Sequence, residues 1–294
     1  MMTTILDGGM GRLLARMGAP FKQPEWSALA LMEAPETVLE AHRQYIAAGA
    51  GVITTNAYAV VPFHVGEEVF ARDGARLIGL AARLARQAAD EVPGTVVAGS
   101  LPPLFGSYRP DLFDAARAPD LLKVLVEEQA PYVDLFLAET TSSIAEATAA
   151  ATAMKATGKP LWVSFTIEDD DPARPTAKLR SGEPVAEAAL AMKALGAEAV
   201  LFNCSQPEVM GAAIDAATAA LAGSGIRVGV YANAFPPRGG GSEANAGLSR
   251  LRVDLGEEAY CACAIDWRRR GASIIGGCCG IFPEQIAAVK KAIG

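Results

Sequence analysis

The chain has 294 residues, of which 51% are hydrophobic, and it carries a formal net charge of −7 at pH 7. Such a chain can bury a large core, but it has no basic stripe, which argues against nucleic acid as a partner because phosphates need clustered Lys and Arg. No apolar run reaches the ~20 residues that span a bilayer. The first residues lack the basic and apolar regions of a secretory signal. We therefore expect a soluble, cytoplasmic protein whose five cysteines are metal ligands, catalytic groups or core residues and form no disulfide scaffold.

Short apolar segments alternate with helical patterns along the whole chain. The segments are rich in Val, Ile, Leu and Phe without polar alternation, which is typical of parallel strands covered on both faces. They lie at residues 4–6, 51–55, 95–99, 133–138, 161–166, 199–202, 227–231 and 273–275. The main helical patterns lie at residues 35–48, 71–92, 118–132, 143–157, 184–195, 206–222, 256–270 and 283–293, several with Pro near the start and Gly just after the end.

Eight strands that are each followed by a helix predict an α/β fold, a (β/α)8 TIM barrel formed as a single domain by residues 1–294. The alternative is an open doubly wound sheet, but no Gly-x-Gly-x-x-Gly turn follows the first predicted strand. In a barrel, the active site lies at the C-terminal ends of the strands. Polar residues gather at these ends while the strand bodies are apolar; they are Asp7, Thr54, Tyr58, Ser100, Glu139, Asn203, Cys204, Asn233, Cys278 and Cys279.

Three of these residues are cysteines from two strand ends, Cys204, Cys278 and Cys279. Three thiols that converge predict one metal ion with three sulfur ligands and an open fourth position, which is the arrangement of catalytic zinc. Adjacent side chains of a strand point to opposite faces, so we expect the glycines within residues 276–280 to let the backbone leave strand geometry. The alternatives are two buried apolar cysteines, or a glycine loop at 276–280 that binds phosphate.

The remaining titratable groups give weaker signals. Carboxylates at strand ends beside a thiolate-rich metal, Asp7 and Glu139, are expected to bind a cation such as a substrate ammonium; helix capping or an ion pair with Arg is the alternative. His42 is predicted on a helix face. His64 is predicted as a surface residue, and the alternative is that it lines the site. Cys261 and Cys263 are two residues apart in a helical pattern, which points them apart, and we expect core or surface roles for them.

Five motifs together identify a resemblance that covers nearly the whole chain. They are Asp7-Gly-Gly-Met-Gly11, the segment from Gly49 to Tyr58, Glu139-Thr140, Asn203-Cys204 and Gly276-Gly-Cys-Cys-Gly280. With these motifs the chain resembles the homocysteine S-methyltransferase family. The resemblance implies a (β/α)8 barrel whose zinc is held by Cys204, Cys278 and Cys279, with the homocysteine sulfur in the open position. It also implies that Asp7 and Glu139 hold the homocysteine ammonium, and that Thr54, Tyr58 and Asn203 surround the substrate.

The chemistry of such a site favours a cationic methyl donor. A free thiol has a pKa of about 8.5, zinc deprotonates it, and the thiolate is the nucleophile. A negative zinc–thiolate centre suits a sulfonium donor, S-methylmethionine or S-adenosylmethionine, because charge is neutralised in the transition state. The donor cation would lie over Tyr58 or Trp26. Betaine is an alternative donor, and methylfolate is disfavoured because the chain has no room for cobalamin and folate modules.

Two readings of other classes stay open at this point. A phosphate-binding lyase or isomerase would use the loop at 276–280, but it needs a lysine at a strand end, and neither Lys159 nor Lys178 is placed there. A non-catalytic zinc or redox-sensing protein would use Cys278 and Cys279. Two segments depart from the family pattern, at residues 100–108 and 231–235, and they cover the face where the donor would enter. The glycine-rich segment at 234–247 is interpreted as either a lid or a disordered surface loop.

Overall fold

The computed structural model describes residues 3–174, 176–236 and 250–294. Within these residues, eight parallel strands form one sheet, and they confirm the eight predicted strands with ends that differ by a few residues. The strands are β1 (Thr4–Ile5), β2 (Val52–Thr54), β3 (Val96–Leu101), β4 (Leu135–Thr141), β5 (Leu161–Phe165), β6 (Ala199–Asn203), β7 (Arg227–Ala232) and β8 (Ile274–Gly277).

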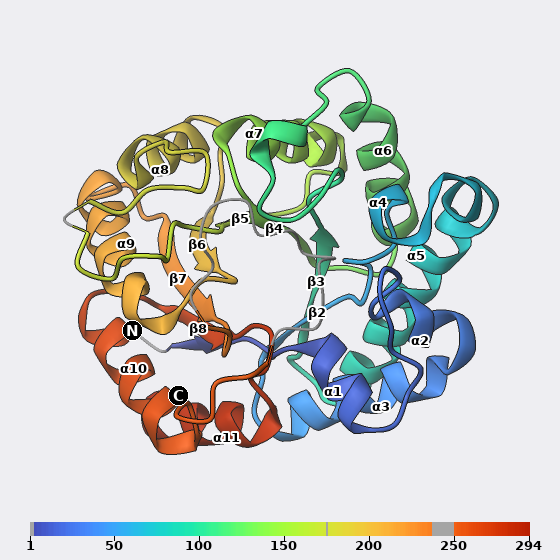
Figure 1. The fold of residues 1–294 in the computed structure, drawn as a ribbon, viewed down its shortest axis with the longest axis horizontal. Helices are drawn as coiled ribbons and strands as arrows, with labels where there is room; N and C mark the ends of the chain where they lie inside the picture. Colours follow the sequence, from blue (N-terminus) through green and yellow to red (C-terminus); the bar gives the residue numbers. More distant parts are fainter. Residues whose placement is uncertain (1–2, 175, 237–249) are drawn as a thin grey trace.

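The sheet curls into a nearly closed barrel, seen end-on in Figure 1. The strand order is β1-β8-β7-β6-β5-β4-β3-β2, so β1 and β2 are the two edges that must meet. They meet at a parallel bridge between Leu6 and Val52. The Asp7 N–H donates to the Val52 carbonyl at 3.0 Å, and the Gly51 N–H donates to the Ile5 carbonyl at 2.9 Å. This closure confirms the predicted (β/α)8 barrel and excludes the open doubly wound sheet.

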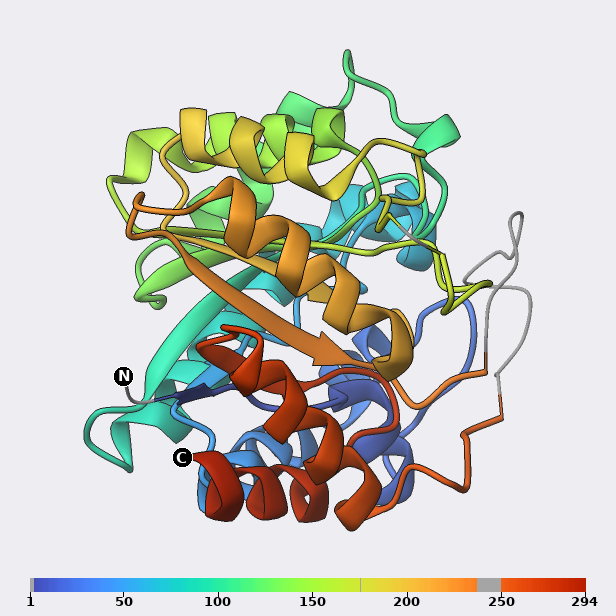
Figure 2. The same ribbon diagram turned by 90° about the vertical axis from the view of Figure 1, so that its left-hand side faces the viewer.

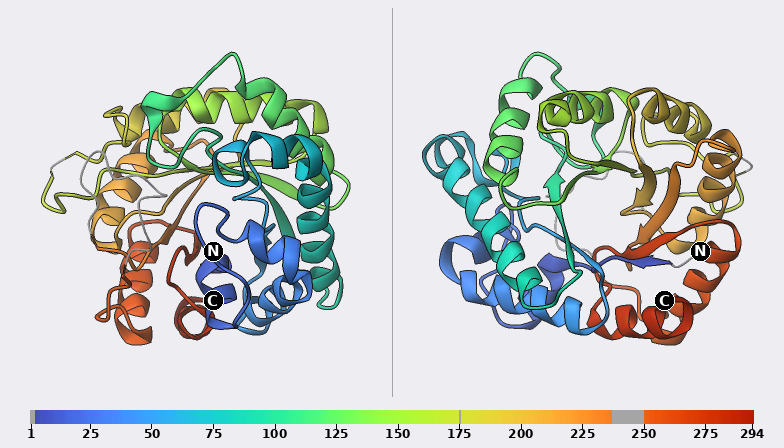
Figure 3. Two further views of the ribbon diagram at one scale, coloured as in Figure 1. Left: turned by 45° about the vertical axis from the view of Figure 1, so that its right-hand side comes forward. Right: turned by 180° about the vertical axis from the view of Figure 1, so that it is seen from behind.

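Helices form a ring outside the strands (Figure 3). The eight predicted helices are confirmed with somewhat different ends, as α3 (Pro35–Ala47), α5 (Glu67–Asp90), α6 (Ala118–Gln129), α7 (Ile144–Met154), α8 (Val185–Ala194), α9 (Pro207–Ala220), α10 (Glu257–Arg269) and α11 (Pro283–Ile293). The sequence reading missed four short elements in the loops after β1, β2 and β3. These are α1 (Met10–Arg16), α2 (Ala28–Glu33), α4 (Pro62–Val65) and the 3-10 turn η1 (Pro110–Leu112), which are too short to show a clear helical period. A further 3-10 turn, η2 (Lys155–Thr157), completes the segment predicted as one helix at 143–157.

Two apolar clusters fill the molecule, one between the strands and the outer helices and one inside the barrel. The inner cluster includes Leu137, Trp162 and Leu201, so the barrel interior is a packed core and no channel. His42 belongs to the outer layer: α3 turns it inward, and its side chain has 0% exposure. Its predicted place in a helix is therefore correct, but the helix face is the buried one.

The register of the strands sets the level at which the site forms. Asn203 of β6 is paired with Tyr231 of β7, and Tyr231 is paired with Gly276 of β8, so these three residues lie at one height. The chain then continues to Cys204 and to Cys278 at the C-terminal rim. Figure 2 shows the two termini at the opposite end, where the strands begin. In the part of the chain that the structure describes, none of the helices has the length and apolar character needed to cross a membrane.

Candidate functional site

The structure brings the three predicted cysteines together at the C-terminal rim of the barrel. The Sγ atoms of Cys204, Cys278 and Cys279 all lie within 4.8 Å of one another. Cys204 is 4% exposed, and the other two are partly exposed toward a cavity that all three line. Three sulfurs around one tetrahedral ion with bonds of about 2.3 Å would be roughly 3.8 Å apart. The cluster is therefore close to the spacing that one shared metal ion requires.

Backbone geometry explains how two adjacent cysteines reach one point. β8 ends at Gly277, so Cys278 and Cys279 follow the strand and are not bound by its alternation. Gly280 has φ +81° and turns the chain, as predicted. Gly276 and Gly277 stay within the strand, which differs from the expectation, because their role is close packing. A Cβ on Gly277 would lie 2.5 Å from Cβ of Ile281, which leaves no room for a side chain.

Cys204 reaches the cluster through a left-handed backbone, with φ +50°. A residue other than glycine is strained in this region and needs support from its surroundings. The thiols also oppose one another electrostatically. Hydrogen bonding with Cys204 and Cys279, followed by burial, raises the pKa of the Cys278 thiol well above its ordinary value. A cation between the three sulfurs would reverse this balance, because a coordinating thiol is deprotonated outright.

Two buried carboxylates line the same cavity. The Thr54 N–H donates to Oδ2 of Asp7 at 2.7 Å, and the Ser100 hydroxyl donates to Oε1 of Glu139 at 2.5 Å. Burial is the largest cause that raises the pKa of Asp7 to about 8 and that of Glu139 to about 7. Among the described residues, neither forms an ion pair, and Asp7 does not cap α1, whose N-cap is Gly9. The two groups are thus poised to be ionised by a bound cation.

The other two predicted substrate residues that line the cavity are Thr54 and Tyr58, whereas Asn203 lies behind it. The Asn203 Oδ1 accepts from the Thr140 N–H at 3.0 Å and from the Ser164 hydroxyl at 2.8 Å. Its Nδ2 donates to Thr140 Oγ1 at 2.8 Å and faces Cys278 Sγ at 4.0 Å. Thr140 has φ +60°. Asn203 therefore fixes the strained residue beside Glu139 and supports the cysteine cluster.

Five aromatic residues form a further part of the cavity lining, here called the aromatic wall: Trp26, Tyr58, His64, Tyr108 and Phe235. Tyr58 and Trp26 were expected here. His64 was expected at the surface, and this is wrong: it is 3% exposed, its Nδ1 lies 3.0 Å from the Pro24 carbonyl oxygen, and it packs edge-on against Trp26. The missed residues come from loops whose path the local sequence does not reveal.

The loop after β3 carries one of these residues to the cluster. Tyr108 has φ +67° and lines the cavity together with Cys204. The Arg180 guanidinium lies over its ring, with its central carbon 4.8 Å from the ring centroid. Beside it, the Ser107 hydroxyl and the Tyr58 hydroxyl are 2.6 Å apart. The contact of Tyr108 with Arg180 and that of Ser107 with Tyr58 therefore hold this loop against the cavity.

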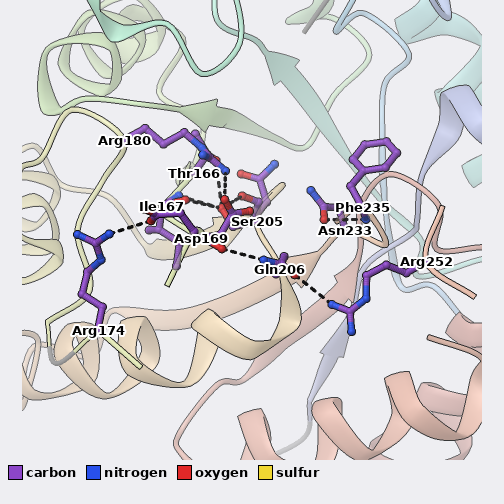
Figure 4. A network of polar contacts seen from close by, with 12 residues as sticks. Thr166, Ile167, Asp169, Arg174, Arg180, Ser205, Gln206, Asn233, Phe235 and Arg252 are labelled. Atoms are coloured by element: carbon purple, nitrogen blue, oxygen red, sulfur yellow. Dashed lines mark hydrogen bonds and ion pairs between the residues drawn. The ribbon is translucent and has the colours of Figure 1, made fainter. Parts of the chain in front are cut away.

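A polar network supports the chain directly after Cys204 (Figure 4). The Ser205 hydroxyl accepts from the Ile167 N–H at 3.0 Å. The Gln206 side chain donates to the Asp169 carbonyl at 2.7 Å. Arg180, only 9% exposed, pairs with the buried Asp169 at 3.0 Å. These contacts connect the β5 and β6 loops and hold the left-handed turn at Cys204.

Three other features do not form part of this site. A second hollow lies between α6 and α7 on the outer layer, away from the cysteines. Cys261 and Cys263 are partly exposed and lie outside the cysteine cluster, as expected.

In the 276–280 loop, the Gly277 N–H already donates to the Asp7 carbonyl at 2.9 Å and the Cys278 N–H to the Ala232 carbonyl at 2.8 Å. These two amides are therefore not available to bind a phosphate. Residues 237–249, which hold most of the glycine-rich segment, lie outside the described residues.

Comparison with known proteins agrees with this geometry. The family model described as homocysteine S-methyltransferase matches residues 4–293. A homocysteine S-methyltransferase of Escherichia coli (strain K12) is 32% identical, with 97% of this chain and 94% of that protein covered. Homocysteine S-methyltransferase 1 of Zea mays is 28% identical, with 98% and 93% covered. The crystal structure of the metallated form of the homocysteine methyltransferase MmuM from Escherichia coli superposes with a TM-score of 0.79 at 27% identity, covering 99% of this chain and 96% of that one. The chain therefore belongs to the homocysteine S-methyltransferase family.

Proposed function

We propose that the protein transfers a methyl group from a sulfonium donor, S-methylmethionine or S-adenosylmethionine, to the thiol of homocysteine, giving methionine. The observation that carries the proposal is the cluster of three cysteines facing a cavity with two buried carboxylates. Membership of the family and the metallated structure of a relative support it. The substrates are therefore small molecules; a cytoplasmic location stays a prediction from the sequence.

We infer that Cys204, Cys278 and Cys279 hold one zinc ion. Three thiolates and an open position match catalytic zinc, and soft sulfur ligands disfavour Mg²⁺ or Ca²⁺. When bound, zinc supplies a positive centre that keeps a substrate thiol in its nucleophilic, deprotonated form. The cysteines, in turn, leave the metal site open toward the cavity because all three line it, directly after the ends of β6 and β8.

Asp7 and Glu139 are proposed to bind the ammonium of homocysteine. Both carboxyls are buried with raised pKa values, about 8 and about 7, so a neighbouring ammonium would lower these values and form a charge-assisted pair. Thr54 and Ser100 fix their orientation through the hydrogen bonds described above. Substrate binding therefore compensates the cost of burying two acids, which favours a cationic amine over a neutral ligand.

The aromatic wall is proposed to hold the donor. A sulfonium near Trp26 or Tyr58 gains cation–π attraction, and the apolar faces exclude water from the transferring methyl. The wall thus positions donor and acceptor for in-line attack, which is the main work left to the protein. Betaine, whose quaternary ammonium would suit the same aromatic faces, is the alternative donor. The phosphate-binding lyase or isomerase is less well supported, because two amides of its proposed anion loop already donate to backbone carbonyls and neither Lys159 nor Lys178 lines the cavity.

Cys204→Ala tests the proposal, with Cys263→Ala as the matched control that removes a thiol outside the cluster. Elemental analysis of reduced protein should give about one zinc per chain in the wild type and the control, and little in Cys204→Ala. With homocysteine and each donor, the wild type and the control should form methionine, and Cys204→Ala should form little. An active, zinc-free variant would contradict the proposal. A fully metallated wild type that transfers no methyl would instead favour a non-catalytic zinc or redox-sensing protein.

A further inference from the structure

Arg12 lines the cavity, and the function proposed above gives it no role. It lies on α1 (Met10–Arg16), three residues after Gly9, and is partly exposed. Its guanidinium carbon is 5.7 Å from the ring centroid of Phe235, another residue of the cavity wall. The side chain therefore reaches from the first turn of α1 toward the mouth of the site.

An amino-acid ligand carries one positive and one negative group, and without Arg12 the cavity lining would offer charged side chains only for the positive group. Two lining carboxylates, Asp7 and Glu139, can accept ammonium groups. Of the described residues that line the cavity, Arg12 is the only lysine or arginine. Homocysteine and a sulfonium derived from methionine each bring a carboxylate as well as an ammonium. Guanidinium is the side chain best suited to a carboxylate, because its planar fork donates two parallel hydrogen bonds.

Arg16, the second arginine of α1, has a structural role. Arg16 pairs with Glu284 of α11 and lies over Phe282, with its guanidinium carbon 4.8 Å from that ring. Its side chain is 49% exposed, and it joins α1 to the outer helix layer. Arg12, one helical turn earlier, lies over the ring of Phe235 in the cavity wall. The two arginines therefore share a helix and a residue type but face different surroundings, which makes Arg16 a matched control.

We propose that Arg12 binds the carboxylate of an amino-acid substrate at the mouth of the cavity. This proposal rests on the proposed function and narrows its substrates to amino acids with a free carboxylate. The carboxylate belongs either to homocysteine or to the methyl donor, since both carry the same group. Loss of a charge-assisted hydrogen bond predicts a roughly 10- to 100-fold weaker interaction with the substrate that Arg12 holds.

The test uses the zinc-loaded enzyme, the variants Arg12→Gln and Arg12→Lys, and the control Arg16→Gln. Methyl transfer is measured with homocysteine and S-methylmethionine, and with each replaced in turn by its decarboxylated analogue, 3-aminopropane-1-thiol or (3-aminopropyl)dimethylsulfonium. Arg12→Gln should raise KM about 10- to 100-fold for one substrate only, and should have little further effect on the analogue of that substrate. The affected substrate identifies whose carboxylate is bound, whereas Arg16→Gln should behave as the wild type.

Other outcomes overturn the proposal. An equal loss with the natural substrate and its analogue would mean that Arg12 acts on the fold or on the reacting atoms, and no loss at all would mean that it binds neither carboxylate. Calorimetric titration of homocysteine and S-methylmethionine tests the role of Arg12 in binding even if the protein does not have the proposed methyltransferase activity. If the wild type binds them and Arg12→Gln binds one of them more weakly, the inference holds even without turnover. If Arg12→Gln binds both as the wild type does, the inference is wrong.

Discussion

The substitution Gly277→Ala tests whether close packing at the end of β8 places the two adjacent cysteines. Gly277 immediately precedes Cys278, and its N–H donates to the Asp7 carbonyl at 2.9 Å. A new Cβ would lie 2.5 Å from Cβ of Ile281, whereas carbon atoms in good contact are about 3.5–4.0 Å apart. Ile281 is fully buried and cannot turn into solvent. The loop from Cys278 to Ile281 must therefore move by about 1 Å.

This displacement has two expected consequences of different size. Overpacking of this kind costs about 1–3 kcal/mol of unfolding free energy, which leaves a protein of this size folded. Metal binding is less tolerant, because metal–ligand distances vary by only about 0.2 Å in well-formed sites. We expect zinc affinity to fall by about 10- to 100-fold, as it does when residues that orient metal ligands are changed.

Zinc competition with a chromophoric chelator, alongside thermal unfolding, measures both effects. Gly256→Ala is the matched control: Gly256 has φ −67°, and a Cβ there would meet nothing within 4 Å. As the N-cap of α10, it should change stability by less than about 1 kcal/mol and leave zinc affinity unchanged. If Gly277→Ala binds zinc as tightly as the wild type, close packing at β8 is not what positions Cys278 and Cys279.

Two further predictions concern a cavity residue and a buried histidine. Tyr108→Phe removes a hydroxyl from a cavity residue that interacts with the Cys204 thiol, so zinc affinity should fall by about tenfold. Tyr132→Phe, outside the cavity, is the control, and equal affinities would exclude a role for the Tyr108 hydroxyl. Burial lowers the pKa of His42 from 6.5 to about 4, so the unfolded chain binds more protons between these values and stability falls as the pH drops through this range. Urea unfolding at pH 8 and pH 5 should show that His42→Gln loses about 2 kcal/mol less than the wild type over this interval. The same loss in both proteins would show that His42 does not titrate in this way.

The sequence was sufficient for the barrel because each strand is an uninterrupted apolar run between helices. An uninterrupted apolar run indicates a strand whose two faces are both buried. Eight such strands, each followed by a helix, most simply close into a (β/α)8 barrel. The same logic located Cys204, Cys278, Asp7 and Glu139, since parallel strands place all their C-terminal ends on one rim. The register that aligns Asn203, Tyr231 and Gly276 then brings the residues that follow them together.

Residues that reach the cavity from loops could not be predicted in this way. His64 is carried by the four-residue helix α4 and is buried by packing against Trp26, a residue far from it in sequence. Tyr108 lines the cavity from a position with a left-handed backbone, and no local sequence pattern predicts that conformation. Arg12 was not singled out, because the short helix α1 that carries it to the cavity shows no clear helical period. Asn203, conversely, was predicted at the rim but lies behind the cavity, where it orders Thr140.

The division between strand ends and loops separates two parts of the proposed chemistry. The cysteines and Asp7 directly follow hydrogen-bonded strands, and Glu139 lies within β4, so the strands fix all of them against the packed interior of the barrel. The residues proposed to meet the donor, including Tyr108 and Phe235, lie on the segments at 100–108 and 231–235, where the sequence departs from the family pattern. A change in these loops can reshape the aromatic wall while the backbone of β6 and β8 stays in place. Donor choice can therefore differ among proteins of this fold without disturbing the thiol-binding centre, so the loops are where the identity of the methyl donor should be sought.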